Sequence, residues 1–167
     1  MDKPWLEQYG GQTARELVAM QDRYRIDSLL SALDDGIQRA LVRRNPAHLT
    51  EPELTVVAVE ALAREVNNGG YEQFFQNSSS IFIHAIVPSL KRIGCPEHAK
   101  IAADAIGHAG ITEDMDPEYI PDHVEDLDEE VIDLLDGCDE RYYDCEEDIE
   151  GLLFAYVEKH QAEIRVP

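Results

Sequence analysis

The stretch that decides the fold is DHVEDLDEEVIDLLDGCDE, residues 122–140, in which apolar and acidic side chains each recur at helical spacing. The apolar positions, at intervals of 3, 4, 3 and 4 residues, are Val124, Leu127, Val131, Leu134 and Cys138. The acidic positions of a second face are Asp122, Asp126, Glu129, Asp133, Asp136 and Glu140. The two stripes predict an amphipathic helix that Gly137 bends or ends.

The negative charge of the chain is concentrated around this stretch. The 167 residues include 35 Asp or Glu and 14 Lys or Arg, which gives a formal net charge of −21. Residues 113–150 hold 19 acids and one base, Arg141, and so carry −18 of that charge. Because this segment also has helical apolar periodicity, we expect it to be folded helix surface rather than a disordered tail.

Composition excludes several classes of protein. A chain of 167 residues with 44% hydrophobic residues is long enough for one domain with its own core. It lacks the basic excess with which nucleic-acid-binding proteins neutralise phosphates, and the same charge disfavours anionic membrane surfaces. It shows no run of 18 apolar residues, no apolar signal core and no C-x-x-C pair among its three cysteines. These features predict a cytoplasmic protein with reduced thiols.

Helical signals run through the rest of the chain. Apolar periodicity predicts one helix or two between about residues 13 and 44, and Thr50-Glu51-Pro52-Glu53 has the pattern of a capping box that opens the next helix. Further helices are expected at 71–76, at 80–93 with a kink or restart at Pro88, at 96–108 and from 149, with a loop at 111–121. Since no strand pattern occurs, the sequence predicts a single compact all-α domain over residues 1–167, with a strongly acidic pair of helices near its C-terminus.

The central segment, residues 67–79, reads NNGGYEQFFQNSS. Asn and Gly suit a helix end, the aromatic residues suit a buried anchor, and Asn and Ser suit the start of the next helix. We therefore interpret the segment as a structural motif. Its residues are Asn67, Asn68, Gly69, Gly70, Tyr71, Gln73, Phe74, Phe75, Asn77 and Ser78.

This motif resembles the signature of the bacterial family called domain of unknown function 4375. The sequences LKRIG at residues 90–94 and LLFAYVEKH at 152–160 resemble further landmarks of that family, so the resemblance covers about residues 54–160. The family includes a helical, dimeric DNA-mimic protein whose acidic surface imitates duplex phosphates and sequesters a DNA-binding transcription factor. The resemblance implies an all-α fold, a homodimer and a basic protein as partner.

We predict a non-enzymatic interaction protein, with no catalytic residues, cofactor or metal site, that blocks or modulates a basic DNA-binding protein. One carboxylate per helical turn gives about one charge per 5.4 Å, against about 1.7 Å in duplex DNA, so the acids must converge on one face to imitate it. The acids assigned to the partner-binding surface are Asp114, Asp116, Glu118, Asp122, Glu125, Asp126, Asp128, Glu129, Asp133, Asp136, Asp139, Glu140, Asp144, Glu147 and Asp148.

Two other functions remain open from the sequence. An immunity or antitoxin protein would use the same acids to cap a basic toxin or nuclease. A small enzyme would use Tyr71, Gln73 and Asn77, although the motif offers no nucleophile with an adjacent base. Metal binding is disfavoured because the Asp126-x-Asp128-x-Glu130 run lacks the glycine of a calcium loop and the histidines show no paired ligand spacing. Cys95 with His98 would suggest a catalytic pair, but that spacing recurs by chance and the sequence shows no orienting partner.

Overall fold

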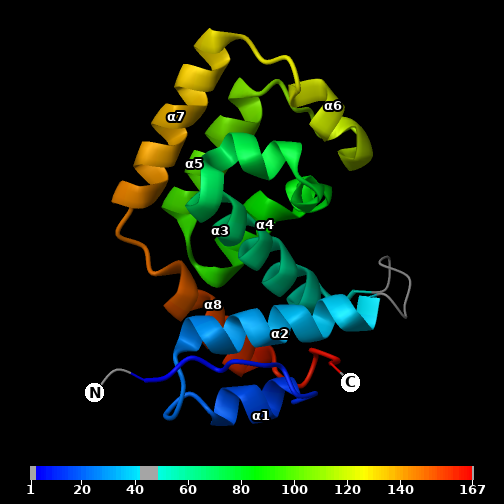
Figure 1. Cartoon of the computed structure of the whole chain (residues 1–167), viewed down its shortest axis with the longest axis vertical. Coiled ribbons are helices and arrows are strands. Elements are labelled where there is room, and N and C mark those ends of the chain that lie inside the picture. The colour runs from blue at the N-terminus through cyan, green and yellow to red at the C-terminus, as the bar shows by residue number, and fades with distance from the viewer. Residues whose placement is uncertain (1–2, 42–48, 167) are drawn as a thin grey trace. The chain divides into compact units, whose positions relative to one another are not determined.

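The computed structural model describes residues 3–41 and 49–166, and these residues form helices joined by short connections (Figure 1). No strand occurs among them, which confirms the all-α fold class. The chain divides into two compact units: unit 1 comprises Met1–Glu60 and Asp148–Pro167, and unit 2 comprises Ala61–Glu147. The single domain expected over residues 1–167 stays a prediction. No helix in the described part of the chain is long and apolar enough to cross a membrane.

The helices of unit 1 are α1 (Ala14–Ala19), α2 (Ile26–Leu41), the beginning of α3 (Glu51–Gln76) and α8 (Ile149–His160). The N-terminal helical region is thus two helices, and its expected end near residue 44 lies outside the described residues. Helices α1, α2 and α8 pack against one another. Their contact buries Leu17 of α1, Leu29 of α2 and Phe154 of α8 almost completely, so apolar burial holds this unit together.

The expected capping box opens α3. The hydroxyl of Thr50 accepts a hydrogen bond from the backbone N–H of Glu53 (3.3 Å), and the Glu53 carboxylate accepts one from the N–H of Thr50 (2.9 Å). Glu53 is 2% exposed and also accepts a hydrogen bond from the N–H of Arg165 (2.6 Å). The cap therefore fixes the C-terminal segment of the chain to the start of α3.

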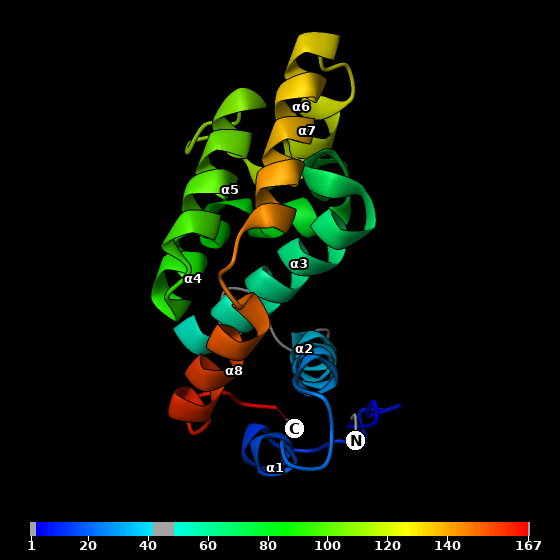
Figure 2. The ribbon, with the colours of Figure 1, turned by 90° about the vertical axis from the view of Figure 1, so that its left-hand side faces the viewer.

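Unit 2 holds the rest of α3 and the remaining helices. These are the 3₁₀ helix η2 (Ser78–Phe82), α4 (Ile83–Ile93), α5 (Pro96–His108), the 3₁₀ helix η3 (Pro117–Tyr119), α6 (Ile120–Val124) and α7 (Glu129–Asp144). Helix α5 packs against both α4 and α7 (Figure 2). Helix α4 continues past the exposed Pro88 without restarting, and it ends at Gly94 with a φ of 93°. This left-handed conformation favours glycine.

Helix α3 bends at the glycine pair of the central motif. Gly69 and Gly70 depart from helical geometry, and Gly70 has a φ of 77°. The chain then resumes a short helix in which Tyr71, Phe74 and Phe75 are fully buried. The helix stop and the buried aromatic anchor are both as expected.

The expectation of one continuous helix over residues 122–140 is wrong. Helix α6 ends at Val124, and α7 begins only at Glu129, after Asp128 in an extended conformation. The buried face of α7 consists of Leu135, Cys138 and Tyr142, whereas Leu134 is 44% exposed. Val124 of α6 and Leu135 of α7 are both 1% exposed, so the helices on either side of the break each contribute to the core.

Three smaller expectations are corrected in the same region. Helix α7 continues through Gly137, because an interior glycine costs a helix only about 1 kcal/mol and Tyr142 is buried beyond it. Residues 111–121 are not all loop, since η3 and the start of α6 lie there. The acids at 144–148 precede α8, whose start at Ile149 is capped by Asp148, so the acidic member of the expected helix pair is α7.

Candidate partner-binding surface

Four acids form an exposed stripe along α7, and we call Glu129, Asp133, Asp136 and Glu140 the α7 ridge. Their spacing of 4, 3 and 4 residues places them on one helix face, and all four are exposed. Glu130 and Asp144 on the same helix are also exposed. The base within this stretch, Arg141, is paired with Asp104 at 2.8 Å, so its charge is partly offset within unit 2.

The linear charge density of α7 approaches that of one DNA strand. Its 15 residue steps correspond to about 22 Å of helix, and the six exposed carboxylates give roughly one charge per 4 Å. A single strand of duplex DNA carries about one charge per 3.4 Å of axis. The six exposed carboxylates of α7 together thus approach the charge density of one DNA strand, whereas the four acids of the α7 ridge alone do not.

Asp139 does not belong to this exposed set. Its carboxylate accepts a hydrogen bond from the backbone N–H of Tyr71 at 2.8 Å, directly after the bend in α3. Burial raises the pKa of Asp139, the hydrogen bond from Tyr71 lowers it, and the charges of Asp136 and Glu72 raise it further, so the net direction is upward. Together with the hydroxyl of Tyr143, which donates to the carbonyl of Val66 at 2.6 Å, Asp139 fastens α7 to α3.

Glu147 is also turned into unit 2. Its carboxylate accepts hydrogen bonds at 2.9 Å from the backbone N–H groups of Glu97 and His98 and makes a third with Nδ1 of His98. Burial raises the pKa of Glu147, but these hydrogen bonds outweigh it, and the pKa lies below its usual value. Glu147 therefore serves as a tertiary cap for the first turn of α5.

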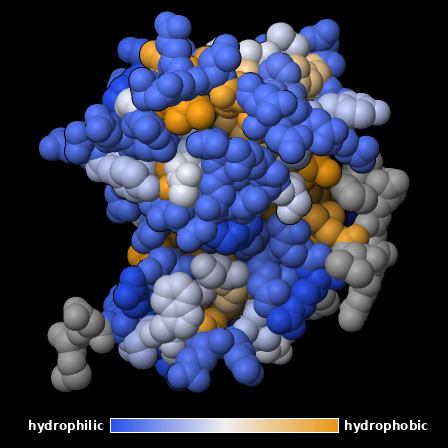
Figure 3. Space-filling view, turned by 45° about the horizontal axis from the view of Figure 1, so that its top comes forward, coloured by the Kyte–Doolittle hydropathy of each residue, from blue (hydrophilic) through white to orange (hydrophobic). Residues whose placement is uncertain are grey.

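The other acids assigned from the sequence fall into two groups. Asp114 accepts a hydrogen bond from the Thr112 hydroxyl (2.6 Å), Asp116 caps η3, and Asp148 belongs to unit 1, where it caps α8. A second group is exposed around α6 and the break before α7, and α6 lies on the other side of helices α3 and α5 from α7 (Figure 1). Its members are Glu118, Asp122, Glu125, Asp126 and Asp128. The surface in view in Figure 3 is mostly hydrophilic, with apolar groups showing between the polar ones.

The central motif is organised by a carboxylate that sequence reasoning missed. Glu65, 9% exposed, accepts hydrogen bonds from the side chains of Gln73 (2.8 Å), Asn77 (2.7 Å) and Ser79 (2.7 Å). The side chain of Asn68 donates to Gln73 at 3.1 Å. An acid among the apolar positions of α3, between Leu62 and Val66, was the signal that could have revealed Glu65.

This network supports the structural interpretation of the motif. The polar side chains that the enzyme alternative would use are engaged with Glu65 or, in the case of Tyr71, buried with the neighbouring rings of Phe75 and Tyr142. A shallow surface cleft does lie beside Asn67, Asn68 and Gln73. The Glu65 carboxylate that lines it holds three hydrogen bonds, which leaves it poorly suited to act as a general base.

The sequence was compared with curated proteins, solved structures and protein-family models. No curated protein and no solved structure matches it. The family model described as DMP19-like protein matches residues 47–160, which is more than half of the chain and includes the central motif and α7. The chain belongs to the DMP19-like protein family, a family of DNA-mimic proteins.

Proposed function

We propose that the protein is a non-enzymatic DNA mimic whose α7 ridge binds the basic surface of a DNA-binding protein, a transcription factor, and blocks its contacts with DNA. The observation that carries this proposal is the set of six exposed carboxylates on α7, the four of the α7 ridge with Glu130 and Asp144, which together give a charge density close to that of one DNA strand. Membership of a DNA-mimic family supports it.

The physical basis of binding is electrostatic competition. Lys and Arg side chains that contact phosphates in a DNA complex would contact the carboxylates of Glu129, Asp133, Asp136 and Glu140 instead. These acids stand on a helix that Asp139 and Tyr143 fasten to α3, so the charged row is held in place before the partner arrives. Long-range attraction between the two surfaces speeds their encounter and is screened by salt.

Co-purification from the native host tests which acids bind the partner. The ridge variant carries Glu129→Gln, Asp133→Asn, Asp136→Asn and Glu140→Gln. The matched control carries Glu118→Gln, Asp122→Asn, Glu125→Gln and Asp126→Asn, which removes the same number of Glu and Asp charges from exposed positions around α6. We expect the wild type and the control to retain a DNA-binding protein and the ridge variant to lose it.

The outcomes of this experiment separate the alternatives. If the ridge variant retains every partner, the α7 ridge is not the binding surface. If only the control variant loses the partner, the binding surface lies around α6. Capture of a nuclease or another toxin in place of a DNA-binding protein would favour an immunity function over DNA mimicry.

Competition with DNA then tests the mechanism. The captured protein, bound to its own duplex, is titrated with the wild type or the ridge variant, and release of DNA is followed by fluorescence anisotropy. We expect release by the wild type alone and an affinity that falls steeply as salt rises. An affinity independent of salt would contradict phosphate mimicry.

We also propose that the protein is a homodimer, as the family resemblance implies. A second copy would lengthen the acidic surface beyond the roughly 22 Å of one α7. Light scattering coupled to size-exclusion chromatography measures the molar mass directly. A mass equal to the 18.9 kDa of one chain at micromolar concentration would contradict the dimer.

A further inference from the structure

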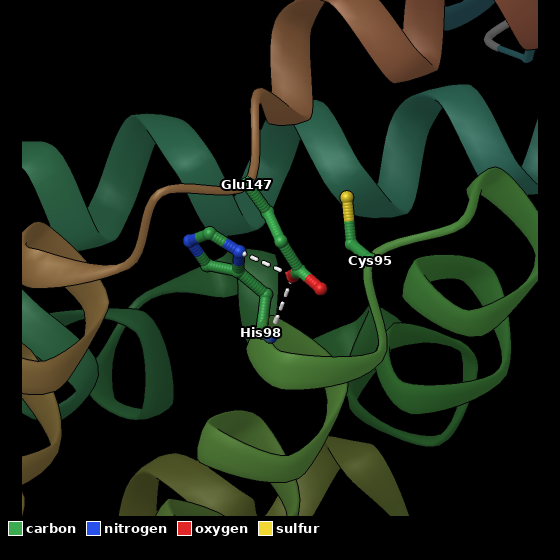
Figure 4. A group of neighbouring side chains, drawn as sticks. All are labelled: Cys95, His98 and Glu147. Carbon is green, nitrogen blue, oxygen red and sulfur yellow. Dashed lines mark hydrogen bonds and ion pairs between the residues drawn. The ribbon is translucent and has the colours of Figure 1, made fainter.

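Three side chains with metal-binding atoms meet at the start of α5. Cys95 precedes the helix, His98 lies in its first turn, and Glu147 comes from the segment after α7 (Figure 4). The Sγ of Cys95, a ring nitrogen of His98 and a carboxylate oxygen of Glu147 all lie within 4.8 Å of one another. Cys95 and His98 are buried and Glu147 is half-buried, so water competes little for these groups.

Cys145 lies beside this group, next to Glu147, but it is not among the residues whose donor atoms all lie within 4.8 Å of one another. Its Sγ lies 3.9 Å from Oε2 of Glu147, and the residue is half-buried. Cys95 and His98 form one short-spaced pair in the sequence, and Cys145 and Glu147 form another, from segments about 50 residues apart in the chain. Zinc sites are commonly built from two ligand pairs on separate segments, and Cys, His and carboxylate side chains are all zinc ligands.

The geometry does not fit a catalytic triad. In a Cys-His-acid triad the thiol and the carboxylate contact opposite nitrogens of the imidazole ring. Here Nδ1 of His98 faces Glu147 at 2.9 Å, and the carboxylate lies between the imidazole and the side chain of Cys95 (Figure 4). The donor atoms converge on a shared space rather than forming a relay.

We propose that Cys95, His98 and Glu147 bind one Zn²⁺ ion and that the side chain of Cys145 turns in as the fourth ligand of a tetrahedral site. Thiolate and imidazole donors select zinc over magnesium and calcium, which prefer oxygen ligands. In a tetrahedral zinc site the ligand atoms stand roughly 3.3–3.8 Å apart, as follows from bond lengths of about 2.0–2.3 Å. The donor atoms of Cys95, His98 and Glu147, which lie within 4.8 Å of one another, would close by about 1 Å around the ion, and Cys145 would move farther.

Zinc binding has a defined proton balance. Cys95 and Cys145 bind as thiolates, so each loses its proton to solvent. The imidazole of His98 moves its proton from Nδ1 to Nε2 and offers the Nδ1 lone pair to the ion. Glu147 exchanges its contact with Nδ1 for the metal and keeps the hydrogen bonds from the N–H groups of Glu97 and His98. Two protons leave as one Zn²⁺ enters, and the net charge of the group is unchanged.

The site is open to solvent on one side. A surface cleft of about 570 Å³ borders Cys145 and Glu147 and is also lined by Asp144, Glu146 and Glu97. Arg141 also lines the cleft but is paired with Asp104, and the carboxylates there attract cations to the entrance. The bound ion would tie the segment after α7 to the first turn of α5, so its effect would be a gain in stability that is independent of partner binding.

Cobalt substitution of the full chain, reduced and freed of metal by a chelator, tests the proposal. We expect Co²⁺ to produce a thiolate-to-cobalt charge-transfer band and the intense visible bands of a tetrahedral site, and one equivalent of Zn²⁺ to abolish both. Cys95→Ser and Cys145→Ser should each remove most of the charge-transfer intensity. Cys138→Ser is the matched control, because Cys138 is buried in α7 outside the group and its loss should leave the spectrum unchanged.

Thermal unfolding with and without Zn²⁺ provides a second readout. Zn²⁺ should raise the unfolding midpoint of the wild type and of Cys138→Ser but not that of Cys145→Ser. Because Cys145 is half-buried, we expect Cys145→Ser to fold even if the substitution of the buried Cys95 prevents folding. A cobalt spectrum without a thiolate band would show that only surface carboxylates bind the ion and would overturn the proposal. An undiminished band in Cys145→Ser would remove Cys145 from the site.

Discussion

At the scale of single residues, the carboxylates of this acidic chain divide into those that face solvent and those that hold the fold. Glu65 belongs to the second kind. Burial raises its pKa, but hydrogen bonds from Gln73, Ser79 and Asn77 and the charge of Arg64 outweigh burial, so the pKa lies below its usual value. The ionised form is thus the one that the fold stabilises.

Glu65→Gln should destabilise the protein by about 1–3 kcal/mol at neutral pH. The NH₂ group of the new glutamine would face side chains that themselves donate hydrogen bonds, so at least one of these donors would lose its acceptor. Urea unfolding measures the change, and Glu72→Gln, which alters a surface contact with Gln76, should change stability by less than about 0.5 kcal/mol. Since the folded pKa of Glu65 is lowered, its contribution is present above the unfolded pKa and is lost as pH falls through the folded value. Equal stability of the two variants would contradict this role.

Asp139 has the opposite pKa shift, and its variants should behave accordingly. Its raised pKa means that the folded state disfavours the charged carboxylate. The ionised group therefore lowers the stability of the fold at a pH above its folded pKa, and this loss of stability disappears at a pH below its unfolded pKa. Asp139→Asn keeps an acceptor for the Tyr71 N–H and should match or exceed wild-type stability at neutral pH, with the difference shrinking in acid. Asp139→Ala leaves that N–H unpaired and should cost about 1–3 kcal/mol. Equal losses in both variants, measured by urea unfolding, would refute the assignment.

At the scale of elements, α7 joins two tasks on one helix. Leu135, Cys138 and Tyr142 bury one face, and the α7 ridge occupies another. Gly137 lies within this helix with open space where a Cβ would stand, whereas a Cβ at Gly70 would collide with Asp139. The two glycines therefore serve different ends: the first is tolerated, and the second is required by the bend in α3.

Alanine substitution distinguishes the two glycines. Gly137→Ala should stabilise the protein by about 0.5–1 kcal/mol, because alanine loses less entropy than glycine in a helix. Gly70→Ala should destabilise it by more than that amount, since the φ of 77° is strained for alanine and Asp139 must move. Chemical denaturation of both variants checks the signs, and a destabilising Gly137→Ala would show that α7 does not continue through residue 137.

At the scale of the whole molecule, self-repulsion accompanies a net charge of −21. The three neighbouring pairs of the α7 ridge cost about 0.2–0.5 kcal/mol each at low salt, and the favourable position of Glu129 at the start of α7 offsets a part of this. A surface that repels itself and is nevertheless kept exposed fits a role in binding cations on another protein.

Salt should accordingly stabilise the free protein. We expect the thermal midpoint of the wild type to rise with sodium chloride, because counterions screen the repulsion. The ridge variant should unfold at the same or a higher temperature than the wild type at low salt and should respond less to added salt. Differential scanning calorimetry across a salt series measures both quantities. A wild-type midpoint that is flat or falls with salt would show that ridge repulsion is negligible.

The sequence by itself determined the helical class, the capping box at Thr50, the stop at Gly69 and Gly70 and the concentration of acids at residues 113–150. These features are local, because capping, glycine conformation and periodicity act between residues a few positions apart. Only the tertiary structure decided which face of α7 is buried: Leu134 and Leu135 are adjacent, and contacts with α3 and α5 select Leu135. The same contacts turn Asp139 and Glu147 inward and bring Cys95 and His98 to Glu147, since the burial of a side chain depends on partners far away in the chain.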